Sequence, residues 1–300
     1  MSDQFRVAVI GLGSMGYGVA ASLHRAGMTT HGFDVAEAQM ARFRAEGGAP
    51  GTLAEVAGTL DAVIVVVLNA AQTEAVLFTE DAIVPQLREG AVVISCATVA
   101  PSFARRMAAE AAAHGVHYLD APISGGAAKA ASGQLSVLAS GTPEAFYAAK
   151  PVLDAAAETV FELGDEPGAG SAMKAVNQLL AGVHIAAMAE AMTFGMTQGV
   201  TPQKFMDVIS QCAGTSWMLE NRGPHIVDGD YTPKSAVDIW PKDLGIVLDI
   251  AREAKFGAPL TAAALQQFLA ASGSGLGRED DAAVAKVYAR NAGITLPGDD

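Results

Sequence analysis

Three glycines that follow the first predicted strand restrict what the N-terminal half can form. In the stretch VAVIGLGSMGYGVAASL, Val7–Leu23, β-branched residues lead into a G-x-G-x-x-G pattern, and an alanine-rich helical segment follows. The first glycine permits a tight turn, the second lets a pyrophosphate approach the backbone, and the third lets helix and strand pack closely. The helix N-terminus would then face the phosphates. The pattern predicts a dinucleotide site whose turn consists of Gly11, Leu12, Gly13, Ser14, Met15 and Gly16.

An acidic residue stands at the matching position of the second strand. Asp34 closes the predicted strand Thr29–Phe33 and lies roughly 20 residues after Gly16, the spacing expected for a ribose-binding acid. A carboxylate accepts hydrogen bonds from both ribose hydroxyls but repels a 2′-phosphate, and no arginine follows directly. The sequence therefore predicts NAD rather than NADP. Because glycine turns of this kind also bind FAD, the chemistry must be read from other motifs.

Short β-rich runs alternate with helical patterns up to Leu163, which predicts a mostly parallel sheet because parallel strands need long crossovers. The predicted strands are Arg6–Ile10, Thr29–Phe33, Ala62–Val67, Ala91–Ser95, Val116–Asp120, Leu135–Ser140 and Thr159–Leu163. Beyond them the pattern is helical, with predicted helices at Ser171–Gln198, Thr201–Cys212, Lys242–Ala254, Pro259–Ala271 and within Arg278–Gly293. We predict an α/β fold with a Rossmann-type domain at residues 1–165 and an all-helical domain at residues 166–300, joined by the long helix.

Composition argues against several other classes of protein. The formal net charge of −13 would repel a phosphate backbone, so nucleic acid is not an expected partner. No apolar run approaches the roughly 18 residues that cross a bilayer, and no signal-peptide pattern is recognised, so we expect a soluble cytoplasmic protein without membrane contact. Cys96 and Cys212 form neither a C-x-x-C pair nor a His/Cys cluster, which predicts no disulfide scaffold and no metal site.

Three further motifs contain candidate site residues. In DAPISGG, Asp120–Gly126, the backbone N–H groups of a Ser-Gly-Gly loop could cradle a carboxylate, or the loop is an ordinary turn. In GAGSAMKAVNQ, Gly168–Gln178, an amine and two amides share one helix face, whereas an apolar stripe that includes Val176 and Leu180 is expected to pack on the core. In WPKDLGIVLDIAREA, Lys242 stands in a first helical turn, where it is either solvated or reaches a cofactor.

With these motifs in this order, the sequence resembles the β-hydroxyacid dehydrogenase family, which includes 3-hydroxyisobutyrate dehydrogenase and tartronate semialdehyde reductase. The resemblance covers essentially the whole chain. It implies a Rossmann-type domain and a helical domain with the active site between them, in a homodimer or homotetramer that acts on a small hydroxy acid. Lys174 would be the catalytic residue. The substrate-binding residues would be Ser124, Gly125, Gly126, Asn177 and Gln178. Beyond the glycine turn, the cofactor-binding residues would be Asp34, Leu68, Asn69, Thr98 and Lys242.

The substrate is less narrowly defined by these motifs. Gln178 stands where hydroxyisobutyrate dehydrogenases have asparagine, and Ala97 precedes Thr98 where the family often has serine. The segment Ser216–Ile239 is similar to that of the L-threonate dehydrogenases of this family, which implies a four-carbon sugar acid. The 3-hydroxyisobutyrate dehydrogenase and tartronate semialdehyde reductase activities remain alternatives.

Oxidation of a secondary alcohol by hydride transfer needs a base for the hydroxyl proton, and Lys174 is the best candidate. The less favoured candidates are His114, His117, His184 and His225, the last in a predicted loop. Two interpretations are open for Asn221, Arg222 and His225. Their side chains bind substrate hydroxyls or contact a partner subunit, or they connect helices of the same chain. Two rivals are less favoured: an imine reductase would normally lack this lysine, and a non-catalytic dinucleotide-binding module would need basic tails or an added domain.

Overall fold

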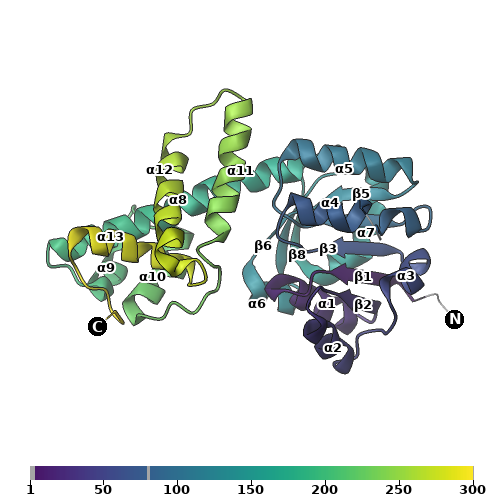
Figure 1. The fold of residues 1–300 in the computed structure, drawn as a ribbon, viewed down its shortest axis with the longest axis horizontal. Helices are drawn as coiled ribbons and strands as arrows, with labels where there is room; N and C mark the ends of the chain where they lie inside the picture. Colours follow the sequence, from purple (N-terminus) through teal and green to yellow (C-terminus); the bar gives the residue numbers. More distant parts are fainter. Residues whose placement is uncertain (1–3, 80–81, 300) are drawn as a thin grey trace. The chain divides into compact units, whose positions relative to one another are not determined.

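The computed structural model describes residues 4–79 and 82–299. Its chain divides into two compact units, one ending at Lys174 and the other beginning at Ala175. Figure 1 shows parallel strands covered by helices in the first unit and helices in the second. This architecture confirms the predicted fold class.

The sheet of the first unit has five parallel strands in the order β2-β1-β3-β4-β5. Their bounds are β1 Arg6–Ile10, β2 Thr29–Phe33, β3 Ala62–Val65, β4 Val92–Ser95 and β5 His117–Asp120. The chain runs outward from β1 to β2 and then crosses to β3 on the other side of β1. The strand order therefore reverses beside β1, and open sheets of this kind bind their ligands at the carboxyl end of such a switch point.

Helices bury both faces of this sheet. They are α1 Ser14–Arg25, α2 Glu37–Ala45, α3 Leu53–Val56, α4 Ala70–Phe78, α5 Pro101–Ala113 and α7 Pro143–Ala156, with short 3-10 helices at Ala57–Thr59 and Val84–Gln86. Val7 and Val9 of β1 belong to one hydrophobic core, whereas Ala8 and Ile10 belong to another. Alternate side chains of a strand point to opposite faces, so a run of apolar residues without polar interruption is what a doubly covered strand requires.

A second sheet of three strands continues the first unit. β7 (Leu135–Ala139) pairs in parallel with β8 (Ala157–Glu162) and antiparallel with β6 (Ile123–Ser124), and α6 (Gly126–Ser132) connects β6 to β7. The sequence predicts β7 and β8 but leaves Ile123–Ser124 in a loop. A strand of two residues is too short to show an alternating pattern.

The second unit continues from α8, and the secondary-structure elements of its described residues are helices joined by loops. Its helices are α8 Ala169–Thr197, α9 Pro202–Ile209, α10 Trp217–Asp228, α11 Ile239–Glu253, α12 Pro259–Ala271 and α13 Ala285–Ala292, with a π-helical turn at Ser272–Leu276 and a 3-10 helix at Asp281–Val284. Ile185, Met192 and Phe268 lie in its core. The ends of α8, α9, α11 and α12 agree with the predicted helices to within three residues. The last predicted helix is shorter, because its first part forms the 3-10 helix, and α10 is not predicted by the sequence.

The prediction that His225 lies in a loop is wrong, because His225 belongs to α10. Gly223 and Pro224 interrupt the helical pattern of this segment and hide the helix. The structure compensates at its start, where the Ser216 side chain accepts a hydrogen bond from the backbone N–H of Leu219 (3.1 Å). The helix is then stabilised mainly by tertiary burial of Leu219 and Ile226.

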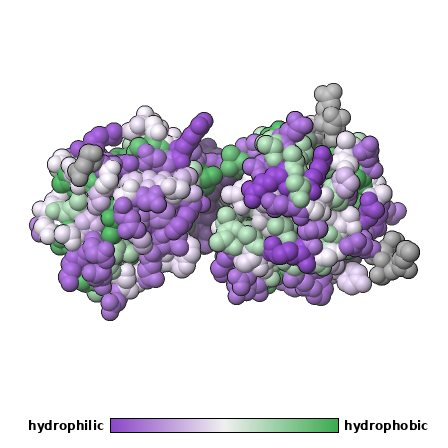
Figure 2. Space-filling model, turned by 90° about the horizontal axis from the view of Figure 1, so that it is seen from below, coloured by the Kyte–Doolittle hydropathy of each residue, from purple (hydrophilic) through white to green (hydrophobic). Residues whose placement is uncertain are grey.

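Two expectations about α8 also need correction. The apolar stripe does not pack on the core throughout, because Val176 is 54% and Leu180 is 49% exposed. The second expectation is that no apolar run is long enough to cross a membrane. Among the described residues, α8 meets that criterion by length and composition. Ile185 and Met192 on its other face are fully buried, as in the central helix of a soluble protein. Figure 2 shows one face of the molecule, on which hydrophilic residues predominate around scattered hydrophobic patches.

Candidate active site

Five loops that carry predicted site residues leave the sheet at its carboxyl edge. The glycine turn follows β1, Asp34 follows β2, Leu68 and Asn69 follow β3, Thr98 follows β4, and Ser124 lies four residues after the end of β5. Because the strands are parallel, their carboxyl ends lie along one edge. The fold therefore brings the predicted nucleotide-binding residues of the first unit together.

The glycine turn fits the close approach of a dinucleotide. A Cβ on Gly16 would lie 1.8 Å from the backbone oxygen of Gly11, so only glycine lets α1 pack this closely on β1. Gly11 has φ +98°, and a Cβ there would lie 2.3 Å from the Val66 oxygen. A Cβ on Gly13, in contrast, would meet no heavy atom within 4 Å. Gly11 and Gly16 are therefore explained by packing, whereas Gly13 leaves open space at the N-terminus of α1.

Other residues of the turn contribute unequally. The Leu12 side chain is buried in the core, so its backbone is what remains for a ligand. Ser14 and Met15 form the first residues of α1, whose N-cap is Gly13 without a side-chain hydrogen bond. A helix N-terminus whose N–H groups have no side-chain cap suits a phosphate.

Asp34, which follows β2, accepts hydrogen bonds from backbone groups of the glycine turn and of its own loop. Its Oδ2 accepts a hydrogen bond from the Leu12 backbone N–H (2.6 Å), and its Oδ1 accepts one from that of Ala36 (2.8 Å). The carboxylate is partly exposed, and each oxygen retains a further lone pair for a ligand hydroxyl. The arrangement fits an acid that both shapes the turn and accepts hydrogen bonds from a ribose.

The loops after β3 and β4 have local explanations as well. Asn69 is the N-cap of α4, where its side chain accepts a hydrogen bond from the Gln72 backbone N–H (2.9 Å). Leu68 is 50% exposed at the same edge. Thr98 is partly exposed between buried Ala97 and Val99, so its side chain is accessible on the edge where the others lie.

The Ser-Gly-Gly loop joins β6 to α6. Gly125 (φ +132°) and Gly126 (φ +77°) both adopt conformations that favour glycine, and both are exposed. A Cβ on Gly126 would meet no heavy atom within 4 Å. The loop therefore offers accessible backbone beside Ser124.

Lys174 lies against this same stretch. It is only 8% exposed, and its Nζ donates a hydrogen bond to the backbone oxygen of Ile123 (3.0 Å), the residue before Ser124. The structure thus brings together the predicted base and the predicted carboxylate loop within the first unit. This is not the position of an ordinary surface lysine.

The remaining predicted residues form a chain of polar contacts between α8 and α11 in the second unit. Asn177 donates to the Oε1 of Gln178 (2.9 Å), and the Nε2 of Gln178 donates to the Oδ2 of Asp243. The ammonium of Lys242 lies 2.6 Å from the other oxygen of Asp243. Asp243 is 2% exposed, and the sequence offers no signal for it beyond its position next to Lys242. It is the functional candidate that sequence reasoning missed.

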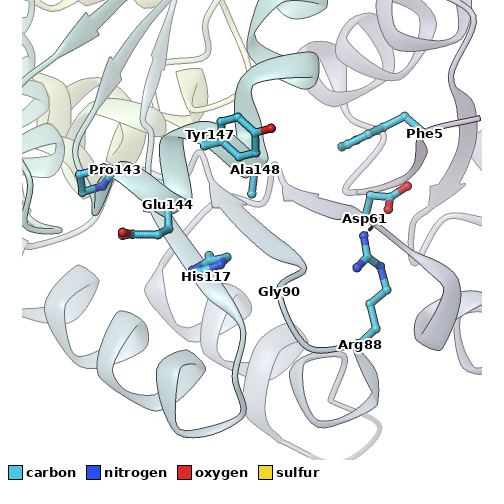
Figure 3. Close-up of a pocket in the computed structure, with 9 residues that line it drawn as sticks. All are labelled: Phe5, Asp61, Arg88, Gly90, His117, Pro143, Glu144, Tyr147 and Ala148. Carbon is cyan, nitrogen blue, oxygen red and sulfur yellow. Dashed lines mark hydrogen bonds and ion pairs between the residues drawn. The ribbon is translucent and has the colours of Figure 1, made fainter.

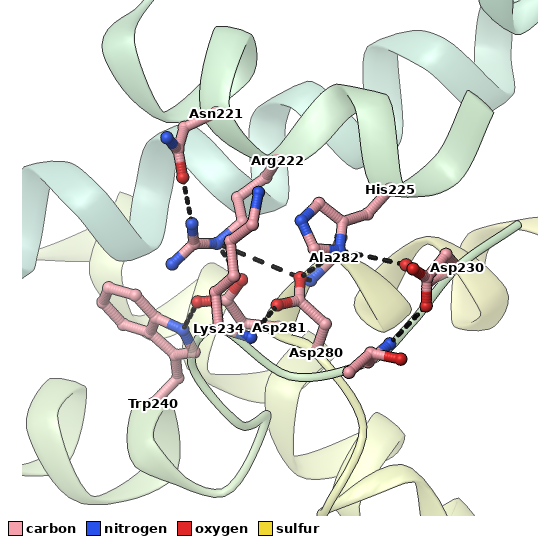
Figure 4. Close-up of polar contacts among 10 residues, drawn as sticks. Asn221, Arg222, His225, Asp230, Lys234, Trp240, Asp280, Asp281 and Ala282 are labelled. Carbon is pink, nitrogen blue, oxygen red and sulfur yellow. Dashed lines mark hydrogen bonds and ion pairs between the residues drawn. The ribbon is translucent and has the colours of Figure 1, made fainter. Parts of the chain in front are cut away.

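Asn221, Arg222 and His225 have structural roles in this arrangement. Figure 4 shows Arg222 reaching Asp281, and Asn221 accepting a hydrogen bond from Arg222. His225 Nδ1 lies 3.6 Å from Asp280, and Trp240 donates to Asp281 (2.9 Å). Both aspartates are fully buried, and burial raises the pKa of Asp281 to about 6. The group ties helices together, as one of the two sequence interpretations proposes.

One cavity lies away from the predicted site. It has a volume of about 640 Å³ and is lined by residues that include Phe5, Asp61, Arg88, His117 and Tyr147 (Figure 3). Phe5, Asp61 and His117 lie at or just before the first residues of their strands, so the cavity is at the amino edge of the sheet. Open parallel sheets bind their ligands at the opposite edge, so neither this cavity nor His117 belongs to the dinucleotide site.

Comparison with known proteins defines the class. Residues 6–164 match the family model of the NAD binding domain of 6-phosphogluconate dehydrogenase, and residues 168–288 match that of NADP-dependent 3-hydroxyisobutyrate dehydrogenase. The chain belongs to the β-hydroxyacid dehydrogenase family of NAD(P)-dependent oxidoreductases, which confirms the predicted family and enzyme class.

Individual relatives are similar over nearly the full length. The chain is 52% identical to the L-threonate dehydrogenase of Cupriavidus necator over 97% of this chain and 98% of that protein. It is 48% identical to the L-threonate dehydrogenase of Escherichia coli K12, over 99% of this chain and 98% of that one. A crystal structure of 3-hydroxyisobutyrate dehydrogenase from Salmonella typhimurium matches with a TM-score of 0.88 and 48% identity, over 95% of this chain and all of that one.

Proposed function

We propose that this protein oxidises the secondary alcohol of L-threonate with NAD, and that Lys174 is the general acid/base. The observation that carries the mechanism is the hydrogen bond from Lys174 Nζ to the Ile123 oxygen (3.0 Å), which holds the amine beside the Ser124–Gly126 loop. A hydroxy acid whose carboxylate bound that loop would present its hydroxyl to the amine. The similarity to L-threonate dehydrogenases at 46–52% identity supports the substrate.

In this proposal each group has a defined task. The backbone of Gly125 and Gly126, with the Ser124 hydroxyl, binds the substrate carboxylate. Asn177 and Gln178 orient the substrate, with Gln178 held by Asp243. Lys174 takes the hydroxyl proton during oxidation and returns it during reduction. When bound, NAD⁺ supplies the hydride acceptor for the carbinol carbon.

The cofactor would be held by the glycine turn from Gly11 to Gly16 and by Asp34. Leu68, Asn69 and Thr98 line the same edge, and the resemblance to the family adds Lys242 to the proposed cofactor-binding residues. The negative charge of Asp34, followed by Val35 and Ala36 rather than arginine, supports NAD over NADP. These assignments remain predictions about individual residues.

Three further properties are proposed from the resemblance to this family. We propose a domain boundary near residues 165 and 166, a cytoplasmic location, and a homodimer or homotetramer. Exposed Val176, Leu180 and Phe194 on α8 support an oligomer, since large apolar side chains on one helix are otherwise left in water.

The proposal is tested with Lys174→Met, which keeps most of the side-chain length but removes the ionisable nitrogen. General acid–base catalysis contributes about 10² to 10⁴ in rate, so kcat with L-threonate should fall at least roughly a hundredfold. NADH binding and folding should persist. In the unmutated enzyme kcat for oxidation should rise with pH through one ionisation, and that step should be absent from the variant.

Lys150→Met is the matched control, because Lys150 is an exposed helical lysine that pairs only with nearby Asp154 in the contacts described for it. Its kcat should equal that of the unmutated enzyme. The substrate is tested by NADH formation with L-threonate, D-threonate, 3-hydroxyisobutyrate, glycerate and serine. Near-normal turnover by folded Lys174→Met would remove Lys174 from the mechanism, and a higher kcat/KM for another acid would replace L-threonate.

A further inference from the structure

A buried carboxylate stands at the end of β5, where the proposed reaction does not use it. Asp120 is 1% exposed, and four donors surround its two oxygens. Oδ2 accepts from the backbone N–H of Gly168 (2.9 Å) and of Ser171 (2.8 Å), and from the Ser140 hydroxyl (3.3 Å). Oδ1 accepts from the Ser171 hydroxyl (2.7 Å). Burial raises the pKa of Asp120 above its ordinary value, and these hydrogen bonds offset only part of that rise.

Two of those donors are backbone N–H groups at the start of α8. The first N–H groups of a helix have no partner within the helix, and a negative charge is favoured there. Asp120 satisfies the N–H groups of Gly168 and Ser171 directly. The Ser140 hydroxyl, which donates to Asp120, accepts from the N–H of Gly170 (2.9 Å). The first turn of α8 is therefore fastened to β5 by side chains from outside the helix.

The helix is also in close backbone contact with the strands at this point. A Cβ on Gly170 would lie 2.3 Å from the Leu138 oxygen and 2.7 Å from the Asp120 oxygen. Asp120 and Ser140 exchange backbone hydrogen bonds of 3.0 and 2.8 Å, which join the two sheets. The first turn of α8 thus has little freedom to move relative to β5.

Lys174 lies one turn beyond this fastening, on the same helix. Its Nζ contacts the oxygen of Ile123, and Ile123 is three residues after Asp120. A single short segment, Asp120–Gly126, therefore holds α8 at its first turn and also contacts the amine. Because a helix is rigid over one turn, displacement of Ser171 would displace Lys174 with it.

We propose that Asp120 is a positioning residue for Lys174. By holding the first turn of α8 in place, it positions the amine beside the Ser124–Gly126 loop. This inference rests on the proposed role of Lys174. A misplacement of about 1 Å can cost roughly a hundredfold in rate, so the geometry of this turn matters for kcat. Asp120 itself touches neither substrate nor cofactor in this scheme.

The test is a double-mutant cycle of Asp120→Asn with Lys174→Met, read out as kcat. Asn keeps the size and one acceptor oxygen but loses the charge, so Asp120→Asn should lower kcat about tenfold or more and leave the Kd for NADH unchanged. In the Lys174→Met background the same substitution should have no further effect, because residues that act as one unit are non-additive. The pH-dependent step in kcat should shift or weaken in the single Asp120→Asn variant.

Asp280→Asn controls for the loss of any buried carboxylate. Asp280 is also fully buried and accepts backbone hydrogen bonds from Lys234 (2.8 Å) and Ala282 (3.1 Å), but it lies in the second unit's core. This variant should lose stability and keep its kcat and pH profile. If Asp120→Asn does not fold, Ser171→Ala removes one donor to Oδ1 while leaving the backbone contact, and it should show a smaller loss of kcat with the same non-additivity.

The possible outcomes separate this inference from the proposed function. If Lys174→Met is slow and the double variant loses kcat by the product of the two single losses, the positioning role alone is overturned. Near-normal kcat in Lys174→Met would overturn both. A loss confined to melting temperature, matched by Asp280→Asn, would show that Asp120 contributes only to stability.

Discussion

Gly13 and Gly16 give opposite predictions for the same substitution, because their surroundings differ. In Gly16→Ala, the added Cβ would begin 1.8 Å from the Gly11 backbone oxygen, and backbone cannot rotate away. Helix α1 would have to move by more than about 1 Å, and overpacking of this kind costs about 1–3 kcal/mol. Unfolding of a domain this size should then occur roughly 2–10 °C lower.

Gly13→Ala should leave folding nearly unchanged. Gly13 has φ −67°, which alanine adopts readily, and its Cβ would meet no heavy atom within 4 Å. Alanine is a poorer N-cap than glycine by up to about 1 kcal/mol, and the reduced entropy of the unfolded chain offsets a similar amount. The new methyl group would instead occupy the space where a pyrophosphate approaches the backbone. We expect the Kd for NADH to rise at least about tenfold, which corresponds to about 1.4 kcal/mol.

The two variants are compared by urea unfolding and by titration of NADH fluorescence. Each is the control for the other, since Gly16→Ala reports packing and Gly13→Ala reports ligand space. A stable Gly13→Ala protein that binds NADH as tightly as the unmutated one would refute the assignment of this turn. A large loss of stability in Gly13→Ala would show that the space is closed in solution.

Two further predictions concern buried or partly buried acids. Asp34→Ser should lower the ratio of kcat/KM with NAD to kcat/KM with NADP by at least about tenfold, because the repulsion between Asp34 and the 2′-phosphate is removed. Equal use of both cofactors by the unmutated enzyme would contradict this. Burial raises the pKa of Asp281 to about 6 from 3.8, so the folded protein binds more protons than the unfolded one between these values, and the free energy of unfolding should fall as pH rises through that range. Asp281→Asn should remove up to about 3 kcal/mol of this pH dependence, measured by urea unfolding at pH 4 and pH 7, and parallel curves for the two proteins would disprove it.

The sheet could be predicted from the sequence because the residue pattern of its strands reflects whether one or both faces are buried. Strand β1 has the predicted bounds, since its run Val7–Ile10 is apolar on both faces and ends at glycine. Strand β2, Thr29–Phe33, also has the predicted bounds and ends before Asp34. The glycine turn was predictable for a similar reason: Gly11 and Gly16 satisfy steric limits that no other residue meets. Local chemistry and tertiary structure agree at these positions, so a short window suffices.

Helix α10 could not be predicted, because its stabilising partners are far away in the chain. Arg222 and His225 lie in a segment broken by Gly223 and Pro224, and their contacts are Asp280 and Asp281, more than fifty residues later. Local propensity therefore pointed to a loop. Burial of one face against the rest of the second unit determines the helix, and a single sequence does not show which face finds a partner.

The same limit applies to Asp120 and Asp243, whose contacts with α8 could not be predicted from the sequence. Lys174 was recognisable because amides follow it on its own helix face at fixed spacing. The carboxylates that hold the helix and its amides are contributed by β5 and α11, at distances in sequence of 51 and 65 residues from Ser171 and Gln178. An acid at a strand end or after a lysine has no periodicity that distinguishes a buried acceptor from a solvated side chain. The groups that do chemistry can therefore be proposed from motifs, whereas the groups that orient them emerge only from the fold.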